Sequence, residues 1–157
     1  MAYAVYLAAV DPEEVESLRA GATTGLRTRE VIGVTDLVTY WIKEKPLGVI
    51  VHEIVDEGAP LGDAFWHPRR PPNVQTPEDV RSLENRLRQA WQELPEETRH
   101  AHLFSKEMGQ ILSLLASAVR EGSALVSALE PPAGEIAKVR CPFDASAQLP
   151  FPWGDLT

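Results

Sequence analysis

The spacing of apolar residues along the chain changes between a period of two and a period of three to four, which predicts a mixture of strands and helices. Residues 2–10 alternate as a strand does and are largely apolar on both sides, so we expect this strand to lie inside a sheet. Residues 124–129 form a second short apolar run of the same character. Helical spacing fills much of the chain between them. We therefore expect an α+β fold in which a small sheet packs against several amphipathic helices.

Capping residues mark the expected starts of the first two helices. Asp11 and Pro12, followed by two glutamates, predict a helix that ends at Gly21, because the aspartate can cap it, the proline fits its first turn and the acids suit its dipole. Asp36 is expected to cap a second helix over residues 37–45, which the following proline stops.

The two longest helices are predicted in the second half of the chain. Residues 76–79 read Thr-Pro-Glu-Asp, which combines a capping threonine, a proline in the first turn and an acid at the capping-box position. Apolar residues at helical spacing continue from there to Leu94, and a short helix or turn is expected up to about residue 104. Ser105 is expected to cap the last helix, which ends at Gly122.

Between residues 47 and 57 the spacing and the composition favour different structures. Apolar residues recur at i, i+3, i+4, i+7 and i+8, which is the stripe of a buried helix face, at Leu47, Ile50, Val51, Ile54 and Val55. Valine and isoleucine are typical of strands, so a buried strand is the alternative. We favour a helix closed by Gly58, because the opposite face is nearly all polar and carries His52, Glu53, Asp56 and Glu57.

The remaining segments are expected to be loops, with one exception. The chain between the first two helices is expected to be a loose basic loop, and residues 59–74 a long proline-rich loop pinned by aromatic side chains. Residues 135–141 are the exception, since they could add a hairpin strand. We therefore expect one domain over residues 1–130, with a proline-rich extension over 131–157 packed on it.

Composition and charge exclude several kinds of protein. The 157 residues carry 15 Lys and Arg against 23 Asp and Glu, a formal charge of −8, which argues against a general nucleic-acid binder. The acidic surface either only keeps the protein soluble or also binds a basic partner protein. The single cysteine, Cys141, excludes an internal disulfide and a cysteine-rich zinc site. We expect a cytoplasmic protein with no membrane span, because no basic residue precedes the first apolar run and none of the apolar runs reaches about 18 residues.

Few residues carry recognisable chemistry. His52 and Asp56 are four residues apart on the predicted helix, so they can form an acid–base pair. His100 and His102 would point apart on a helix and offer no third ligand, so we expect no metal site. The glycine patterns of nucleotide-binding loops and of serine hydrolases are missing from the sequence, and we expect no cofactor.

One segment resembles a known family. The helical His52 is followed by a Gly-Ala-Pro-Leu turn over residues 58–61 and then by the Thr-Pro-Glu-Asp-Val start over 76–80. This order resembles the YfbM-like family of small bacterial proteins, although that family has an aromatic residue ahead of the histidine where this chain has Lys-Pro-Leu-Gly over 45–48. The resemblance implies a compact α+β fold and a setting similar to that of immunity and other interaction proteins, and it implies no catalytic residues.

These observations lead to a functional hypothesis with one alternative. We expect a non-enzymatic bacterial protein-binding domain, in its sharpest form an immunity protein that neutralises a basic toxin domain. The expected docking residues are acidic, with one aromatic anchor: Glu53, Asp56, Glu57, Asp63 and Trp66. The alternative is a small hydrolase or transferase in which His52 and Asp56 form the catalytic pair, and the oligomeric state stays open.

Overall fold

The computed structural model describes residues 3–20, 25–61, 70–130 and 141–144 of the chain. In this part of the chain five strands form one antiparallel sheet with the spatial order β2-β1-β5-β4-β3. The strands are β1 (Ala4–Val10), β2 (Thr28–Thr35), β3 (Ala59–Pro60), β4 (Asn73–Gln75) and β5 (Ala124–Leu129).

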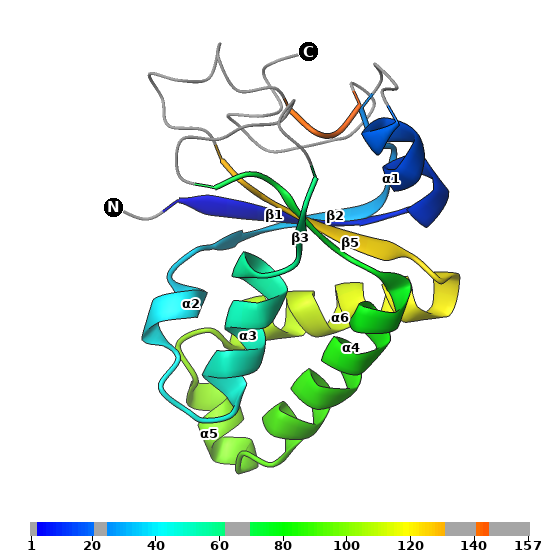
Figure 1. The fold of residues 1–157 in the computed structure, drawn as a ribbon. Helices are drawn as coiled ribbons and strands as arrows, with labels where there is room; N and C mark the ends of the chain where they lie inside the picture. Colours follow the sequence, from blue (N-terminus) through cyan, green and yellow to red (C-terminus); the bar gives the residue numbers. More distant parts are fainter. Residues whose placement is uncertain (1–2, 21–24, 62–69, 131–140, 145–157) are drawn as a thin grey trace.

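Helices lie on both sides of this sheet, and the expected α+β fold is confirmed (Figure 1). Within the described ranges they are α1 (Pro12–Arg19), α2 (Val38–Trp41), α3 (Leu47–Asp56), α4 (Pro77–Gln92), α5 (Glu96–Ala101) and α6 (Ser105–Glu121). Five of them, α2 to α6, are on one side of the sheet, and α1 is on the other (Figure 1).

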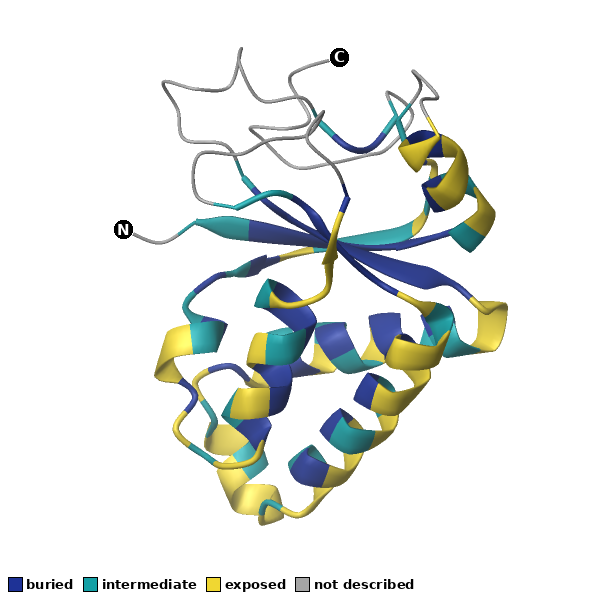
Figure 2. Cartoon of the chain, viewed as in Figure 1, coloured by how far each residue is buried: buried dark blue, intermediate teal, exposed yellow. Residues whose placement is uncertain are grey.

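The sheet separates two apolar cores. The larger core joins one face of β1 and β5 to the inner faces of α3, α4 and α6. The smaller core lies on the other face, where Val15 and Leu18 of α1 meet Leu26 and Phe143. Figure 2 shows the same arrangement, with buried residues along the sheet and on the helix faces turned toward it. Strand β1 has a neighbouring strand at each edge and an apolar core on each face, which explains why its side chains are apolar on both faces.

The helical interpretation of residues 47–57 is confirmed, and the strand alternative is wrong. All five apolar stripe residues are buried on α3. The helix ends at Asp56, and Gly58 follows with a φ of 126°. A Cβ at Gly58 would lie 2.8 Å from the carbonyl oxygen of Val74, so this glycine meets both a backbone and a steric requirement.

The predicted capping box at the start of α4 is confirmed. The Thr76 hydroxyl accepts from the Asp79 N–H at 3.1 Å, and the Asp79 carboxylate accepts from the Thr76 N–H at 3.2 Å. Gly122 also ends α6 as expected, with a φ of 64°. The expected cap at Ser105 is wrong, because Phe104 is the N-cap residue and α6 has no side-chain cap.

Two segments predicted as loops contain strands. The basic loop includes β2, whose residues pair with β1 along its whole length. It lies at the edge of the sheet and only Val34 of its residues is buried, so its apolar alternation is weak. The proline-rich segment includes β3 and β4, and β4 was not apparent because two of its three buried residues, Asn73 and Gln75, are polar.

The helix expected over 37–45 is also shorter than predicted. Only the four residues of α2 are helical, and Ile42 is already extended. Asp36 does not cap it, since Leu37 is the N-cap residue. The Asp36 carboxylate instead accepts from the Tyr3 N–H at 2.9 Å, which ties the end of β2 to the start of β1.

Most of the C-terminal extension lies outside the described residues, and so does most of the hairpin strand predicted over 135–141. The described residues of the extension, 141–144, lie against the smaller core. Phe143 is buried and forms a parallel bridge with Leu26, whose N–H donates to the Pro142 carbonyl at 2.8 Å. Among the described helices, none is both long enough and apolar enough to span a membrane.

Candidate functional site

The C-terminal end of α3 is held by a buried side chain from the sheet. The side-chain amide of Gln75, on β4, donates to the Glu53 carbonyl at 2.9 Å and to the Glu57 carbonyl at 2.8 Å. The Glu53 carbonyl also accepts the Glu57 N–H at 3.3 Å, so the Gln75 amide adds a second donor there and supplies a donor to the Glu57 carbonyl, which lies just beyond the last helical turn. Gln75 therefore fixes where α3 ends above the sheet.

Two further polar side chains complete this attachment. The amide of Asn73, also on β4, donates to the Asp56 carbonyl at 3.1 Å. The hydroxyl of Ser127, on β5, donates to the Val55 carbonyl in a short hydrogen bond. All three donors are buried, and together they set the position of the polar residues at the end of α3.

A hollow of about 270 Å³ lies beside this end of α3. We call it the His52 hollow, and it is lined by Asp36, Tyr40, His52, Asp56, Arg70 and Leu129. Its residues come from the end of β2, from α2, from α3, from the chain before β4 and from the end of β5, so only the fold brings them together.

The expected His52 and Asp56 pair does form, and it lies within the hollow. His52 Nε2 is 3.5 Å from Asp56 Oδ2, while Nδ1 is 3.5 Å from a Glu57 carboxylate oxygen. Arg70 Nε lies 3.5 Å from the other Asp56 oxygen, and Arg70 also donates to the Ser127 hydroxyl at 3.2 Å. Asp56 is thus shared between a histidine and an arginine, and His52 is about half exposed.

The hollow contains a second carboxylate. Asp36 is only 6% exposed, and one of its oxygens accepts the Tyr3 N–H. Tyr40 stands at the rim with 64% of its surface exposed. Of the described residues that line the hollow, only Tyr40 carries a hydroxyl group and none is a cysteine, so no serine, threonine or cysteine nucleophile lies beside the His52 and Asp56 side chains there.

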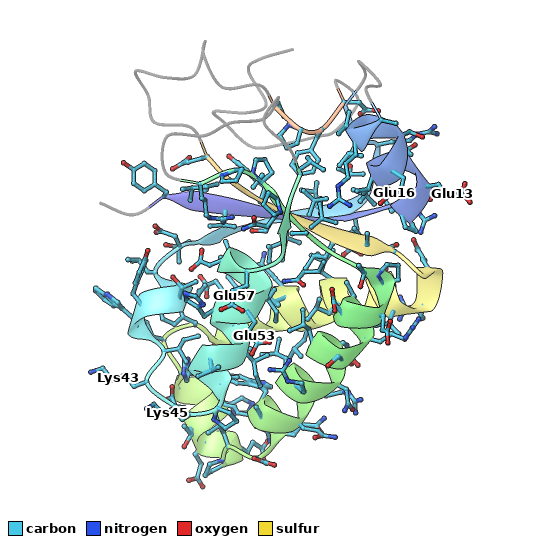
Figure 3. The ribbon with its side chains drawn as sticks, in the orientation of Figure 1. Glu13, Glu16, Lys43, Lys45, Glu53 and Glu57 are labelled. Atoms are coloured by element: carbon cyan, nitrogen blue, oxygen red, sulfur yellow. The ribbon has the colours of Figure 1, made fainter. Side chains whose placement is uncertain are left out.

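The acidic residues predicted for docking have different surroundings. The Glu53 carboxylate accepts two hydrogen bonds from the Arg86 guanidinium, at 2.8 and 2.7 Å, which joins α3 to α4. This hydrogen bonding holds the pKa of Glu53 below its usual range. Glu57, the residue that follows α3 (Figure 3), is more exposed than Glu53. Asp63 and Trp66 lie outside the described residues.

Sequence reasoning missed a second depression, which is also lined by a residue of α2. We call it the Trp41 groove, with a volume of about 530 Å³ and with walls formed by Trp41, Lys43, Glu44, Glu97, Thr98, Ala101, His102, Leu103 and Phe104. Trp41 is 57% exposed and Leu103 is 70% exposed. One signal was available in the sequence. Tyr40 and Trp41 are adjacent, and adjacent helix positions do not face the same way, so both could not enter the core.

Two polar residues that line the Trp41 groove, His102 and Glu44, are held by hydrogen bonds. His102 is nearly buried, and its Nδ1 accepts the Phe104 N–H at 3.1 Å, which leaves the ring proton of a neutral imidazole on Nε2. That nitrogen donates to the Glu44 carboxylate at 3.1 Å, and this hydrogen bond lowers the pKa of Glu44. The edge of Trp91 also packs against the imidazole, with ring centroids 5.4 Å apart. His102 therefore serves the structure of the groove.

Metal and thiol chemistry find little support in the described ranges. Across them, no three His, Cys, Asp or Glu side chains are grouped so as to hold a metal ion. Burial raises the pKa of the Cys141 thiol to about 11, which suits an apolar packing role better than a reactive one.

Comparison with known proteins adds no relative. The chain matches no family model, no curated protein and no solved structure. The resemblance to the YfbM-like family therefore stays a prediction, and functional inference depends on the chain's own geometry.

Proposed function

We propose that this protein is a non-enzymatic protein-binding domain whose docking surface is centred on α2. The observation that carries the proposal is the exposure of Trp41 and Leu103 on the walls of one groove, with Tyr40 exposed beside them. Tryptophan and tyrosine are enriched among the residues that dominate binding energy at protein interfaces. Large apolar side chains that gather at an exposed groove are typical of an interaction surface.

The charge of the molecule favours a basic partner. The chain has a formal charge of −8, and the groove itself is lined by Glu44 and Glu97 against one cation, Lys43. A partner that presents an apolar side chain flanked by lysine or arginine fits both the walls and the rim. The acidic surface would speed the encounter, while the apolar contacts would supply affinity. An immunity protein that neutralises a basic toxin domain in the bacterial cytoplasm is the sharpest form of this proposal.

The docking surface is tested with proteins encoded by the genes next to this one. We expect one of them to bind in isothermal titration calorimetry, and Trp41→Ala and Leu103→Ala each to weaken binding by about tenfold or more. Val49→Ala is the matched control, because Val49 is 53% exposed, also apolar, and outside the groove. Equal effects of all three substitutions would refute the assignment of the surface.

Self-association is the competing explanation of the same surface. The oligomeric state is measured by size-exclusion chromatography with light scattering. A monomer is expected. A dimer that Trp41→Ala converts to a monomer would show that the groove joins two copies of this chain, and it would refute the proposal.

A small hydrolase or transferase is the second candidate, favoured by the hollow that surrounds His52 and Asp56. It predicts slow turnover of activated esters or phosphate esters that His52→Ala abolishes. Lack of turnover, or turnover that survives this substitution, would remove the candidate.

A further inference from the structure

We infer that the free edge of β2 receives an extended segment of the partner protein, which joins the sheet as an additional antiparallel strand. This inference rests on the proposed protein-binding function and names a second contact with the same partner. Strand β2 ends at Thr35 and α2 begins at Val38, so a segment that pairs with this edge lies close to the proposed docking surface. Addition of a strand to an exposed sheet edge is a recurring way in which proteins recognise extended segments.

The two edges of the sheet differ in how they are protected. Strand β3, at one edge, has only two residues, and one of them is Pro60, which has no N–H to offer an incoming strand. Strand β2, at the other edge, has eight residues, and neither proline nor lysine is among them. Its pairing with β1 shifts register between Ala9 and Val10, so the regular part of this edge is residues 30–35. The open edge of the sheet is therefore β2.

Alternate peptide groups on this edge are available for pairing. The Asp36 N–H donates to the Tyr3 carbonyl at 2.9 Å, and the antiparallel ladder alternates from there, so the peptide groups of residues 30, 32 and 34 face β1. The peptide groups of Val31, Gly33 and Thr35 face away from β1, and in the described part of the chain none of them has a hydrogen-bond partner. Another extended chain presents donors and acceptors at the same spacing, which defines the kind of ligand.

The side chains along the edge indicate the composition of the incoming segment. Ile32 and Val34 pack on the larger core, so apolar β-branched residues beside them would extend that core. Glu30 lies on the same face of the sheet, because side chains alternate along a strand, and among the described residues it has no ion-pair partner. The neighbouring Arg29 is already engaged, since its guanidinium donates to the Ser123 hydroxyl at 2.8 Å. The segment should therefore carry a lysine or arginine opposite Glu30.

A second copy of the chain fits this edge less well. The regular edge is about 20 Å long and one strand spacing, about 4.8 Å, wide, whereas a stable interface buries about 800 Å² of each partner. Each copy also carries a formal charge of −8, so two copies repel one another, whereas a basic segment is attracted. A basic segment whose protein is also anchored at the docking surface meets both conditions.

The first test measures amide hydrogen exchange in the free protein by NMR, alongside light scattering. The amides of Ile32 and Val34 bond to β1 and should be protected, whereas those of Val31, Gly33 and Thr35 should exchange about a hundredfold faster or more. Protection of the outward amides would mean that the edge is already covered, by the rest of this chain in a monomer or by a second copy in a dimer. Either result would overturn the inference.

The second test uses a synthetic strand, so it does not depend on finding the partner. The probe is the peptide Ac-Thr-Thr-Val-Thr-Val-Thr-Lys-Thr-NH₂, which is titrated into the ¹⁵N-labelled protein. Antiparallel pairing that sets its position 4 opposite Gly33 places its lysine opposite Glu30. We expect saturable amide shifts that centre on β2, and lack of saturation would overturn the inference.

Two N-methylated isomers of this peptide test whether its backbone pairs with the edge. N-methylation at positions 4 and 6 removes the N–H groups that face β2, so it should weaken binding by about tenfold or more. N-methylation at positions 3 and 5 removes N–H groups that point away from β2, so it should leave binding nearly unchanged. Equal effects of the two isomers would overturn the inference.

Charge exchange tests the predicted register. The wild type should bind the peptide with lysine at position 7 several-fold more tightly than one with glutamate there, and Glu30→Lys should reverse this preference. Glu16→Lys is the control, because it makes the same change of net charge at an exposed acid on α1 (Figure 3). A preference that Glu30→Lys does not reverse, or that Glu16→Lys reverses equally, would overturn the inference.

These experiments and the test of the docking surface can fail separately. Peptide binding at β2, without any effect of Trp41→Ala on partner binding, would leave the edge as a strand-binding site and would refute the docking surface. A partner that binds through Trp41, while the peptide does not bind, would leave the docking surface and would overturn the inference about the edge.

Discussion

Gln75 offers the sharpest test of how the site is positioned. The substitution Gln75→Glu changes one NH₂ group to an oxygen and leaves the size of the side chain almost unchanged. In the native protein that NH₂ group donates to the carbonyls of Glu53 and Glu57, and Gln75 is only 8% exposed. The variant would lose both hydrogen bonds and place a carboxylate against two carbonyl oxygens.

The expected cost follows from these contacts. An acceptor that loses its partner costs about 1–3 kcal/mol; the Glu57 carbonyl would bear that cost, while the Glu53 carbonyl keeps the Glu57 N–H, and repulsion of both carbonyls by the carboxylate brings the loss to about 2–5 kcal/mol. For a chain of this size each kcal/mol lowers the melting temperature by about 2–4 °C, which predicts a decrease of roughly 4–20 °C.

The loss should also depend on pH. Burial beside carbonyl oxygens raises the pKa of the introduced carboxyl above its unfolded value. Its destabilising effect is therefore largest above the raised folded value and smallest below the unfolded value, where the protonated carboxyl regains one of the two donors. The difference in stability between the variant and the wild type should be largest at neutral pH and should shrink in acid.

Differential scanning calorimetry at neutral and acid pH measures both effects. Gln110→Glu is the control, because it makes the same chemical change at a half-exposed position on α6. If Gln75→Glu costs no more than Gln110→Glu, the attachment of α3 to the sheet is not what Gln75 provides. A loss that is the same at both pH values would refute the electrostatic part of the reasoning.

Two further predictions concern the helices. On α6, Gly109→Ala should stabilise the protein by about 0.5–1 kcal/mol, because Gly109 is exposed within the helix and no atom lies within 4 Å of an added Cβ. At Gly122 an added Cβ also has no atom within 4 Å, but the residue has a φ of 64°, so Gly122→Ala should destabilise the protein by about 1 kcal/mol. Chemical denaturation measures both substitutions, and a change of the same sign in the free energy of unfolding for both would contradict the backbone explanation. Glu53→Gln should cost at most about 1 kcal/mol at neutral pH, because its partner Arg86 is partly exposed. The pKa of Glu53 is lowered in the folded state, so the stability it contributes is present above the unfolded pKa and is lost as the pH falls through the folded value. Urea denaturation should therefore show the cost of the substitution shrinking in acid, and a constant cost would contradict this account.

Elements that depend on nearby residues could be predicted from the sequence. The start of α4 follows from Thr76 and Asp79, which bond to one another across three positions. The five apolar residues of α3 share one face, and their period outweighed the strand preference of valine and isoleucine. In both cases the information lies within about ten residues of chain.

Elements that depend on distant contacts were missed. Gln75 and Asn73 look like loop residues in sequence, and they are buried because their amides meet the end of α3. Asp36 looks like a helix cap, but its actual partner is the N–H of Tyr3, the residue before β1. A polar residue that is buried by its hydrogen bonds leaves no periodic signal.

The candidate site shows the same division. The pairing of His52 with Asp56 was predicted, because four residues of helix bring them together. Arg70 and Asp36 enter the same hollow from distant parts of the chain, and no sequence spacing relates them to His52. Trp41 and Leu103 likewise meet at one groove although they are far apart in sequence.

The place of β1 in the sheet has a consequence for synthesis of the protein. This first strand pairs with β5, the last described strand, and the Ala4 N–H reaches the Glu130 side chain across 126 positions. Until the ribosome has released β5, one long side of β1 has no native neighbour, and an open strand edge invites pairing with other chains. Nascent chains that stall before β5 should therefore be the ones that depend most on chaperones.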